Sequence, residues 1–511
     1  MRITFLCRGF ESISLEYLSA ALKKAGHSVT LAYDATPSGS VESKINRNLL
    51  SRFLFDSREN AIRQVVDSKP DLVGFSVVSD SYPWACHMAQ RIKEEIGVPI
   101  IFGGIHPSSL PERVLKKAFV DYVCIGEGEE AIVELSEALS KKEEVTGILN
   151  IWKKKDGQIV KTGVRSLVRD LDSLPFPDKD LFYKLYPGFV NNIYWIICSR
   201  GCLYQCTFCY NSALKYLYGE EPHFLRRRSV GNIIKELKEA KEKYGIKKVF
   251  FLDDIFGSDL AWLREFSKKY PQEIGLPYYC AIFPHILEKK EEVISLLEKS
   301  GCTAVGMGVQ SVDERIRKNI LKRPGSNSEI REIIELFQKT KMFLYPDIIL
   351  GLPLQNEEEL IKTASFFNQH SVDVISTLWL RYYPKTEICA IAQENGFLTA
   401  EELRENEEGK DIFSPTDKGS TYNKNLAQLA NLIDISAWLP QGIMNFLVKK
   451  RIYRFFPTIN FYLLYHLGVF LLKRVRGKKK GPLYFNIFQR VYYYFYFVPL
   501  NIRYRWRIND R

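Results

Sequence analysis

The sequence lacks a long apolar run near its first residue. Residues 1–8 (MRITFLCR) are too short, and too soon interrupted by charge, to form the hydrophobic core of a secretory signal peptide. We therefore expect a cytoplasmic, reducing compartment. There, ten cysteines indicate metal binding or burial rather than a disulfide framework.

Internal repeats and long low-complexity tracts are also missing. The composition, 46% hydrophobic and 26% charged, is that of a folded protein. The length of 511 residues is enough for about three domains.

Acidic residues are almost absent from the end of the chain. Residues 449–511 contain fifteen Lys or Arg but one acid, Asp510, and eighteen of the sixty-seven aromatic residues. The whole chain carries a formal charge of +12, so the remainder without this tail sums to −2. The chain is a near-neutral body with a basic, aromatic tail, and not a uniformly basic nucleic-acid-binding protein.

A dinucleotide-binding fingerprint, G-x-G-x-x-G, is missing after the first expected strand. The first 140 residues nevertheless alternate apolar, strand-like runs with segments of helical spacing. The expected strands are residues 3–6, 29–31, 71–78, 99–102 and 121–125. This alternation predicts an α/β domain over residues 1–140: a Rossmann-like or flavodoxin-like, doubly wound parallel sheet that binds ligands at the carboxyl ends of its strands.

The next two segments differ in character. Residues 141–190 read as a linker, with a charged turn at 153–157 and prolines within 174–177. A second β/α series over residues 191–400 predicts a barrel or partial barrel. Its expected strands are 195–197, 248–252, 278–282, 304–308, 345–349 and 375–380.

The C-terminal region, residues 401–511, is expected to be helical, basic and aromatic. Within it, residues 455–472 carry no formal charge, and residues 473–480 are strongly basic. Eighteen uncharged residues are marginal for a membrane span, which needs about 20. Three alternatives stay open: peripheral contact with an anionic membrane surface on the inner face of the cell membrane, a true span, or a cap over the barrel mouth. Nucleic acid is not expected as a partner, because no RNA-binding motif accompanies the charge.

Four of the ten cysteines crowd into residues 198–210 (CSRGCLYQCTFCY). Cys202, Cys206 and Cys209 lie in the loop that leaves an expected strand, where three thiolates can hold a four-iron cluster and leave one iron open to a small molecule. Gly201 permits a tight turn, and Tyr210 is placed to cover the centre. The alternatives are a zinc site or buried cysteines, and Cys198 is expected to pack at the strand end.

The pattern C-x3-C-x2-C followed by an aromatic residue resembles the hallmark of radical S-adenosylmethionine enzymes. Residues 199–209 (SRGCLYQCTFC) resemble the branch with an amino-terminal cobalamin-binding domain. Further segments agree in order and spacing: 226–229 (RRRS), 251–256 (FLDDIF), 306–311 (GMGVQS), 347–353 (DIILGLP) and 383–387 (YPKTE).

This resemblance implies that Cys202, Cys206 and Cys209 bind a 4Fe–4S cluster whose open iron chelates S-adenosylmethionine. An electron from a donor such as a flavodoxin or ferredoxin would release a 5′-deoxyadenosyl radical. The implied cofactor-binding residues are Tyr210, Asp254, Gln310 and Ser311, with Asp253 and Asp254 near the methionyl part. Gln310 stands where many relatives have Glu, and can still accept a hydrogen bond from the ribose. Cys280 and Cys302 are expected to be packed thiols.

In the amino-terminal domain the resemblance rests on three loops, 76–79 (SVVS), 103–107 (GGIHP) and 126–129 (GEGE). It implies that these loops hold cobalamin, through Ser76, Ser79, Gly103, Gly104 and Gly126. The motif Asp-x-His-x-x-Gly is missing; residues 6–11 read LCRGFE, so no histidine of that motif can ligate cobalt. His106 is expected to be structural. The alternative is a flavodoxin-like domain that binds no cofactor.

Together these features predict a cobalamin-dependent radical S-adenosylmethionine enzyme. The expected reaction is methylation of an unactivated carbon of a hydrophobic small molecule. Two alternatives are a radical cyclase or oxidoreductase of the porphyrin-ring-cyclase type, and a non-enzymatic cobalamin or redox sensor. The sequence assigns no catalytic residue beyond the cofactor ligands.

Overall fold

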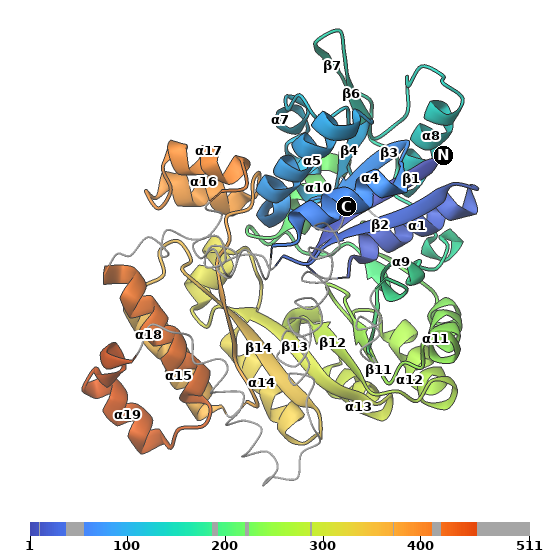
Figure 1. The fold of residues 1–511 in the computed structure, drawn as a ribbon. Helices are drawn as coiled ribbons and strands as arrows, with labels where there is room; N and C mark the ends of the chain where they lie inside the picture. Colours follow the sequence, from blue (N-terminus) through green and yellow to red (C-terminus); the bar gives the residue numbers. More distant parts are fainter. Residues whose placement is uncertain are drawn as a thin grey trace, which may run out of the picture.

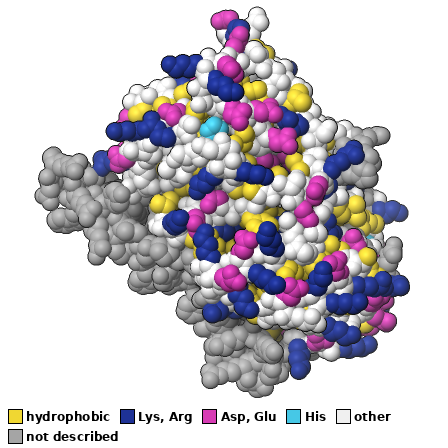
Figure 2. Space-filling view, turned by 90° about the vertical axis from the view of Figure 1, so that its right-hand side faces the viewer, with side chains coloured by type: hydrophobic (Ala, Val, Ile, Leu, Met, Phe, Trp, Pro, Cys, Tyr) yellow, Lys and Arg dark blue, Asp and Glu magenta, His cyan; other side chains and the backbone are white. Residues whose placement is uncertain are grey.

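Two α/β units stacked on one another form most of the molecule in the computed structural model (Figure 1). The structure describes residues 1–9, 11–36, 56–185, 193–219, 224–286, 289–370, 372–410 and 421–456. The expectations for the basic, aromatic tail beyond residue 456 lie outside the described residues. On the visible face of Figure 2, basic and acidic side chains are interspersed, as a near-neutral body requires.

The first unit is built on a seven-stranded sheet with the order β2-β1-β3-β4-β5-β6-β7. Its strands are β1 (Arg2–Arg8), β2 (Ser28–Asp34), β3 (Leu72–Ser76), β4 (Ile100–Gly103), β5 (Tyr122–Cys124), β6 (Ile151–Lys155) and β7 (Gln158–Val160). The first five pair in parallel, and β6 and β7 are antiparallel additions. The doubly wound parallel sheet is confirmed, and the segment expected to be a linker extends it by a hairpin.

Helices cover both faces of this sheet. They are α1 (Ile13–Lys24), α4 (Arg58–Ser68), η1 (Ser79–Ser81), α5 (Tyr82–Ile96), α6 (Ile105–Ser109), α7 (Pro111–Leu115) and α8 (Glu129–Ser140). Helices α1 and α8 pack against one face of the sheet, and α4 and α5 pack against the other face. Two short elements, η2 (Leu171–Ser173) and α9 (Asp180–Tyr183), lead to the second unit.

The second unit is a curled, six-stranded parallel sheet with the order β15-β14-β13-β12-β11-β8, which confirms the partial barrel. Its strands are β8 (Ile193–Ile196), β11 (Lys248–Phe251), β12 (Tyr278–Ile282), β13 (Cys302–Gln310), β14 (Phe343–Leu350) and β15 (Ser376–Trp379). The connecting elements are β9 (Ser199–Arg200), α10 (Tyr210–Tyr218), β10 (Arg226–Arg227), α11 (Val230–Tyr244), α12 (Leu260–Glu273), η4 (Pro284–Ile286), α13 (Lys290–Lys299), the π-helical turn η5 (Ile316–Ile320), α14 (Asn327–Gln338) and α15 (Glu357–Gln369).

The helices of the barrel begin where the sequence supplies caps. The side chains of Ser229, Ser326 and Asn356 each accept a backbone N–H in the first turn of α11, α14 and α15. Each helix then packs its apolar face on the outer side of the sheet in one continuous core.

The described part of the C-terminal region is helical. It consists of α16 (Glu387–Glu394), α17 (Ala400–Glu407), α18 (Thr421–Ser436), α19 (Gln441–Lys449) and η7 (Ile452–Phe455). Helix α18 packs along α15, and α19 lies at the outer edge of the molecule (Figure 1). Within the described ranges no helix is long and apolar enough to cross a membrane.

Candidate active site between the two units

The cysteine loop leaves the carboxyl end of β8 and runs through β9 into α10. Strand β9 pairs antiparallel with β10, so the loop is anchored at its start. Gly201 follows with a φ of +89°, and a Cβ at this position would collide with the carbonyl oxygen of Phe224. The tight turn predicted at Gly201 therefore requires glycine.

The three predicted ligands lie close enough together for their charges to act on one another. Cys206 is buried, and Cys202 and Cys209 are half-buried. Burial, together with the charges of Asp254, Cys206 and Cys202, raises the pKa of the Cys209 thiol to about 12. Thiols in this setting ionise readily only when a cationic centre binds them, which is the behaviour of iron–sulfur ligands.

The donors around the sulfurs suit an anionic cluster. The backbone N–H of Tyr204 points to Cys202 Sγ at 3.5 Å, and Arg323 Nη1 lies 3.3 Å from Cys206 Sγ. Among the described residues, no three His, Cys, Asp or Glu side chains gather around a point that a single metal ion could occupy. In a four-iron cluster each thiolate binds its own iron. The donor set thus fits the cluster.

Two adjacent acids at the end of β11 have different surroundings. Asp253 is buried and accepts the Cys198 N–H (3.0 Å) and the Ser199 hydroxyl, so it fixes the entry to the cysteine loop. Asp254 is open to solvent on one side and accepts from Asn211 Nδ2 at 2.9 Å. Protein around the Asp254 carboxyl raises its pKa, and its charge in turn acts on Cys202 and Cys209. Asp254 is therefore the acid that faces the cysteine loop.

Gln310 is the last residue of β13, and Ser311 follows it directly. Gln310 has a φ of +67°, a conformation that costs free energy in a residue other than glycine and is often found at ligand sites. Its amide Nε2 and Arg323 Nη2 both lie beside Gly308, where a Cβ would sit 3.0 and 3.1 Å from them. Ser311 is buried, and its hydroxyl accepts the Asp313 N–H at 3.2 Å in the turn that follows β13.

On the first unit, the predicted loops come together at the carboxyl ends of β3 and β4. Ser76 pairs with Gly103, and the Val77 N–H donates to the Gly103 carbonyl at 2.8 Å. Gly104 has a φ of +97°, and a Cβ there would lie 2.8 Å from both Val77 N and Val77 O. This is a close backbone approach that only glycine allows.

His106 lies in α6, directly after these glycines in the chain. It is fully buried, its ring stacks on Tyr82 at 4.1 Å, and its Nδ1 lies 2.9 Å from Ser79 Oγ. Burial lowers its pKa to about 4, so the ring is neutral. These contacts agree with the structural role that the sequence analysis expects.

Tyr210, the residue predicted to cover the cluster, contacts both units. Its hydroxyl reaches across to the first unit and lies 2.5 Å from Ser79 Oγ, while its ring contacts Tyr383 at 4.4 Å. The residue next to Cys209 thereby joins the cysteine loop to the cobalamin-type loops. Sequence reasoning could not find this contact, because 131 residues separate the partners.

Tyr218 was not predicted at all. Its hydroxyl accepts the Glu127 N–H at 2.7 Å and lies directly against Gly126, where a Cβ would collide with it. Gly126 has a φ of +70°, and its N–H donates to Ser108 Oγ at 3.0 Å. The C-terminal end of α10 therefore covers the third cobalamin-type loop.

Comparison with known proteins decides the family. Residues 196–367 match the radical SAM superfamily, and residues 9–136 match the B12 binding domain. An uncharacterised methyltransferase of Pyrococcus horikoshii is 30% identical over 338 residues, which cover 64% of this chain and 71% of that protein. The chain belongs to the cobalamin-dependent radical S-adenosylmethionine methyltransferases.

Solved structures of this methyltransferase family and its neighbours share the fold. The cobalamin-dependent S-adenosylmethionine radical enzyme OxsB matches with a TM-score of 0.63 at 15% identity, over 84% of this chain and 66% of OxsB. The methyltransferase TsrM of Kitasatospora setae matches with a TM-score of 0.60 at 17% identity, over 77% of this chain and 76% of TsrM.

The cofactors of this methyltransferase are accordingly a 4Fe–4S cluster, S-adenosylmethionine and cobalamin. Several of its relatives are methyltransferases by name, so neither the ring-cyclase alternative nor the sensor alternative is favoured. The flavodoxin-like alternative without a cofactor is also not favoured.

Proposed function

We propose that this enzyme methylates an unactivated carbon of a hydrophobic small molecule bound on the inner side of the half-barrel. When bound, the cluster and S-adenosylmethionine supply radical chemistry, and cobalamin carries the methyl group. The remaining tasks, which are binding, orientation and exclusion of water, fall to the residues of the chain. A low-potential protein such as a flavodoxin or ferredoxin would supply electrons.

The observation that carries the substrate class is a row of aromatic side chains across three neighbouring strands. The rings of Trp195 and Phe250 are 6.1 Å apart, and those of Phe250 and Tyr279 are stacked at 4.2 Å. All three are half-buried and alternate with the strand residues that pack on the outer helices. Gly306 leaves the space that the Tyr279 hydroxyl occupies. Such a wall favours an apolar or flat ligand.

The contacts described above support four proposed roles in cofactor binding. Cys202, Cys206 and Cys209 ligate the cluster. Asp254, held by Asn211, takes the amino group of S-adenosylmethionine, and Gln310 accepts from its ribose. Tyr210 serves as a positioning residue through its hydrogen bond to Ser79.

On the cobalamin side, the close backbone approach at Gly104 supports a proposal that this loop borders the corrin. Gly103, Gly126 and the hydroxyls of Ser76 and Ser79 complete the proposed cradle. Ser76 already shares a hydrogen bond with Ser14 at 3.0 Å, so its hydroxyl is oriented before the cofactor binds.

The proposed reaction is tested by anaerobic reconstitution with iron, sulfide and cobalamin, followed by mass spectrometry. We expect 5′-deoxyadenosine and S-adenosylhomocysteine together, because one S-adenosylmethionine feeds the radical and another feeds methylation. Cys206→Ala should abolish both products, whereas Cys389→Ala, a buried thiol far along the chain, should keep them. 5′-Deoxyadenosine without S-adenosylhomocysteine would refute methyl transfer.

The substrate class is tested at Phe250. Phe250→Ala removes the central ring of the aromatic row but leaves the cofactor residues in place. We expect S-adenosylmethionine cleavage to continue while methylated product from an apolar lipid extract falls by about tenfold or more, since burying one aromatic side chain is worth about 1.5–3 kcal/mol. Equal methylation by the variant and the wild type would exclude the aromatic row as the binding wall.

We also propose that the edge formed by α19 and η7 contacts an anionic membrane surface. Ile443, Phe446 and Phe455 are large apolar residues with 48%, 55% and 85% of their surface exposed. The exposed cations Lys449 and Lys450 follow Phe446 and are the first residues of the basic, aromatic tail. Each cation near an anionic bilayer adds about 1 kcal/mol of attraction.

Vesicle flotation tests this membrane contact. We expect the full chain to float with phosphatidylglycerol vesicles but not with phosphatidylcholine vesicles, and Ile443→Ser with Phe446→Ser to abolish flotation. Leu354→Ser is the matched control, because Leu354 is also 48% exposed but lies in the turn between β14 and α15. Unchanged flotation of the double variant would exclude α19 as the contact.

A further inference from the structure

Arg323 is a buried cation that points at the cysteine loop. Only 6% of its surface is exposed. Its Nη1 lies 3.3 Å from Cys206 Sγ, and its Nη2 donates to the Gly308 carbonyl at 2.6 Å. The guanidinium also stacks on Phe283, 3.9 Å from the ring centre, and Phe283 stacks in turn on Tyr204 of the cysteine loop at 4.1 Å.

The charge of Arg323 has no ion-pair partner among the described carboxylates. Other buried arginines do: Arg226 pairs with Glu127 at 3.0 Å, and Arg228 with Glu236 at 2.6 Å. Asp347 on β14 lies close enough for Arg323 to lower its pKa, but burial is stronger and raises that pKa to about 6. The groups that interact most strongly with the guanidinium are the thiols of Cys206, Cys202 and Cys209. Burying a cation is costly unless an opposite charge compensates for it, so the sulfur cluster is the natural counter-charge.

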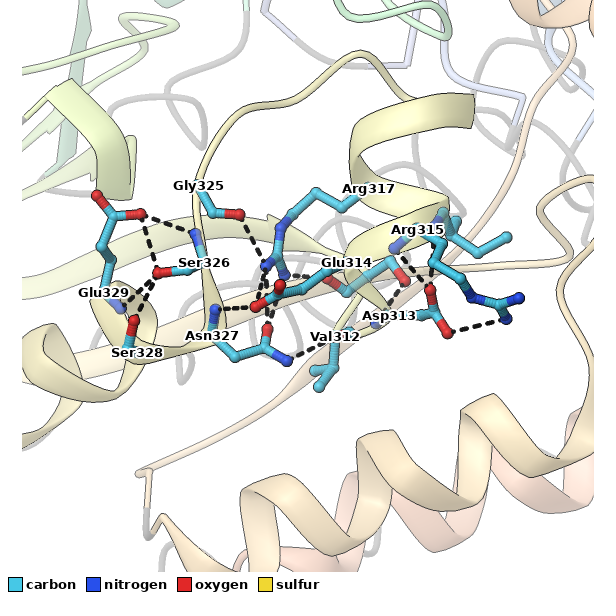
Figure 3. Close-up of polar contacts among 12 residues, drawn as sticks. Val312, Asp313, Glu314, Arg315, Arg317, Gly325, Ser326, Asn327, Ser328 and Glu329 are labelled. Carbon is cyan, nitrogen blue, oxygen red and sulfur yellow. Dashed lines mark hydrogen bonds and ion pairs between the residues drawn. The ribbon is translucent and has the colours of Figure 1, made fainter.

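Hydrogen bonds hold the loop that carries Arg323, between β13 and α14, in place. Figure 3 shows Arg317 at the centre of the network, where it donates to the carbonyls of Ser311 (2.7 Å) and Gly325 (3.1 Å) and to Asn327 Oδ1 (3.0 Å). The Arg323 N–H donates to the Arg317 carbonyl at 2.9 Å. The segment between β13 and α14 is thus tied at both ends, which fixes the backbone of Arg323. The contacts to the Gly308 carbonyl and the Phe283 ring hold its guanidinium beside Cys206.

We propose that Arg323 is a positioning residue that raises the reduction potential of the iron–sulfur cluster. This inference rests on the proposed ligation by Cys202, Cys206 and Cys209. Reduction adds one electron, taken from the donor protein, and no proton, so the cluster becomes more negative by one charge. A fixed cation in a site of low dielectric constant stabilises that extra charge, and its N–H donation to sulfur acts in the same direction.

The test is a redox titration followed by electron paramagnetic resonance, on reconstituted full-length protein without S-adenosylmethionine. We expect Arg323→Met and Arg323→Gln to make reduction about tenfold less favourable, which is 59 mV for a one-electron couple. Arg323→Lys keeps the charge and should stay closer to the wild type than either neutral variant. Arg331→Met, on the exposed side of α14, is the control and should not shift the potential.

Neutral variants with full iron content and an unchanged potential would overturn the inference alone. So would a lysine variant whose potential is as low as that of the neutral ones. If Arg323→Met takes up no iron, the comparison of Arg323→Gln with Arg323→Lys decides by the same criteria. A wild-type chain that assembles no cluster would instead refute the proposed function, and this inference with it.

Discussion

At the scale of single residues, Gly104 shows how a loop is shaped before a ligand arrives. Its φ is +97°, and a Cβ at this position would lie 2.8 Å from Val77 backbone atoms, which leaves no room for a side chain. Gly97 also has a positive φ, +66°, but a Cβ there meets nothing within 4 Å. Gly104 therefore combines backbone strain with a steric collision, whereas Gly97 has backbone strain alone.

We therefore expect Gly104→Ala to weaken cobalamin binding and Gly97→Ala to leave it unchanged. Gly97→Ala carries the cost of a left-handed alanine, about 1 kcal/mol. Gly104→Ala costs more, because a φ of 97° with a ψ of −170° is a conformation that only glycine adopts readily, and because the new Cβ must displace the loop after β3. Cobalamin retained after gel filtration, measured by absorbance, reports the difference. Equal retention by the two variants would show that this loop does not border the cofactor.

The cluster residues could be predicted because their spacing is local. Cys202, Cys206 and Cys209 lie within eight residues, and their chemistry follows from thiol type and distance along the chain. Arg323 lies 117 residues from Cys206, and nothing in its neighbourhood in the sequence distinguishes it from a surface arginine. Contacts of this kind depend on the curl of the sheet, which local patterns do not encode.

At the scale of elements, the hairpin of β6 and β7 could have been predicted from the sequence, but the segment was interpreted as a linker. Asp156 and Gly157 have φ values of 50° and 78°, the left-handed pair typical of a two-residue hairpin turn. The strand β6 (Ile151–Lys155) ends in three lysines and lies between β5 and the edge strand β7. The run of lysines therefore favoured the linker interpretation, although the turn residues indicated a hairpin.

Helix α18 carries a buried acid that makes its docking depend on pH. Asp434 is 2% exposed; its Oδ1 accepts the Thr377 hydroxyl of β15 at 2.9 Å, and its Oδ2 has no partner among the described residues. Burial raises its pKa to about 7. The neutral form is favoured on folding, so the contribution to stability is complete below about pH 4 and is lost as the pH rises through 7.

Asp434→Asn should remove this dependence, because the amide cannot ionise and still accepts from Thr377. We expect the variant to be more stable than the wild type at pH 8, by up to about 4 kcal/mol, with little difference near pH 4. Urea unfolding at the two pH values measures this. A stability difference that does not change with pH would contradict the assignment.

At the scale of the whole molecule, ion pairs fix the two units against each other. Glu127 of the first unit binds Arg200 at 3.2 Å and Arg226 at 3.0 Å, and both arginines flank the cysteine loop. Lys179 is buried between Glu11 (2.6 Å) and Glu16 (2.8 Å), where the chain passes from one unit to the other. The sequence predicted two α/β units but not this docking, because each pair joins residues far apart in the chain.

That docking brings the cysteine loop and the cobalamin-type loops to one place. The central claim is that Cys202, Cys206 and Cys209 of the cysteine loop hold the 4Fe–4S cluster that binds S-adenosylmethionine. Its most direct test is electron paramagnetic resonance of the anaerobically reconstituted, reduced enzyme, with and without S-adenosylmethionine. The account predicts a 4Fe–4S signal that changes when S-adenosylmethionine is added and that is absent from Cys202→Ala, Cys206→Ala and Cys209→Ala. An enzyme that binds zinc in these thiols, or a signal indifferent to S-adenosylmethionine, would contradict it.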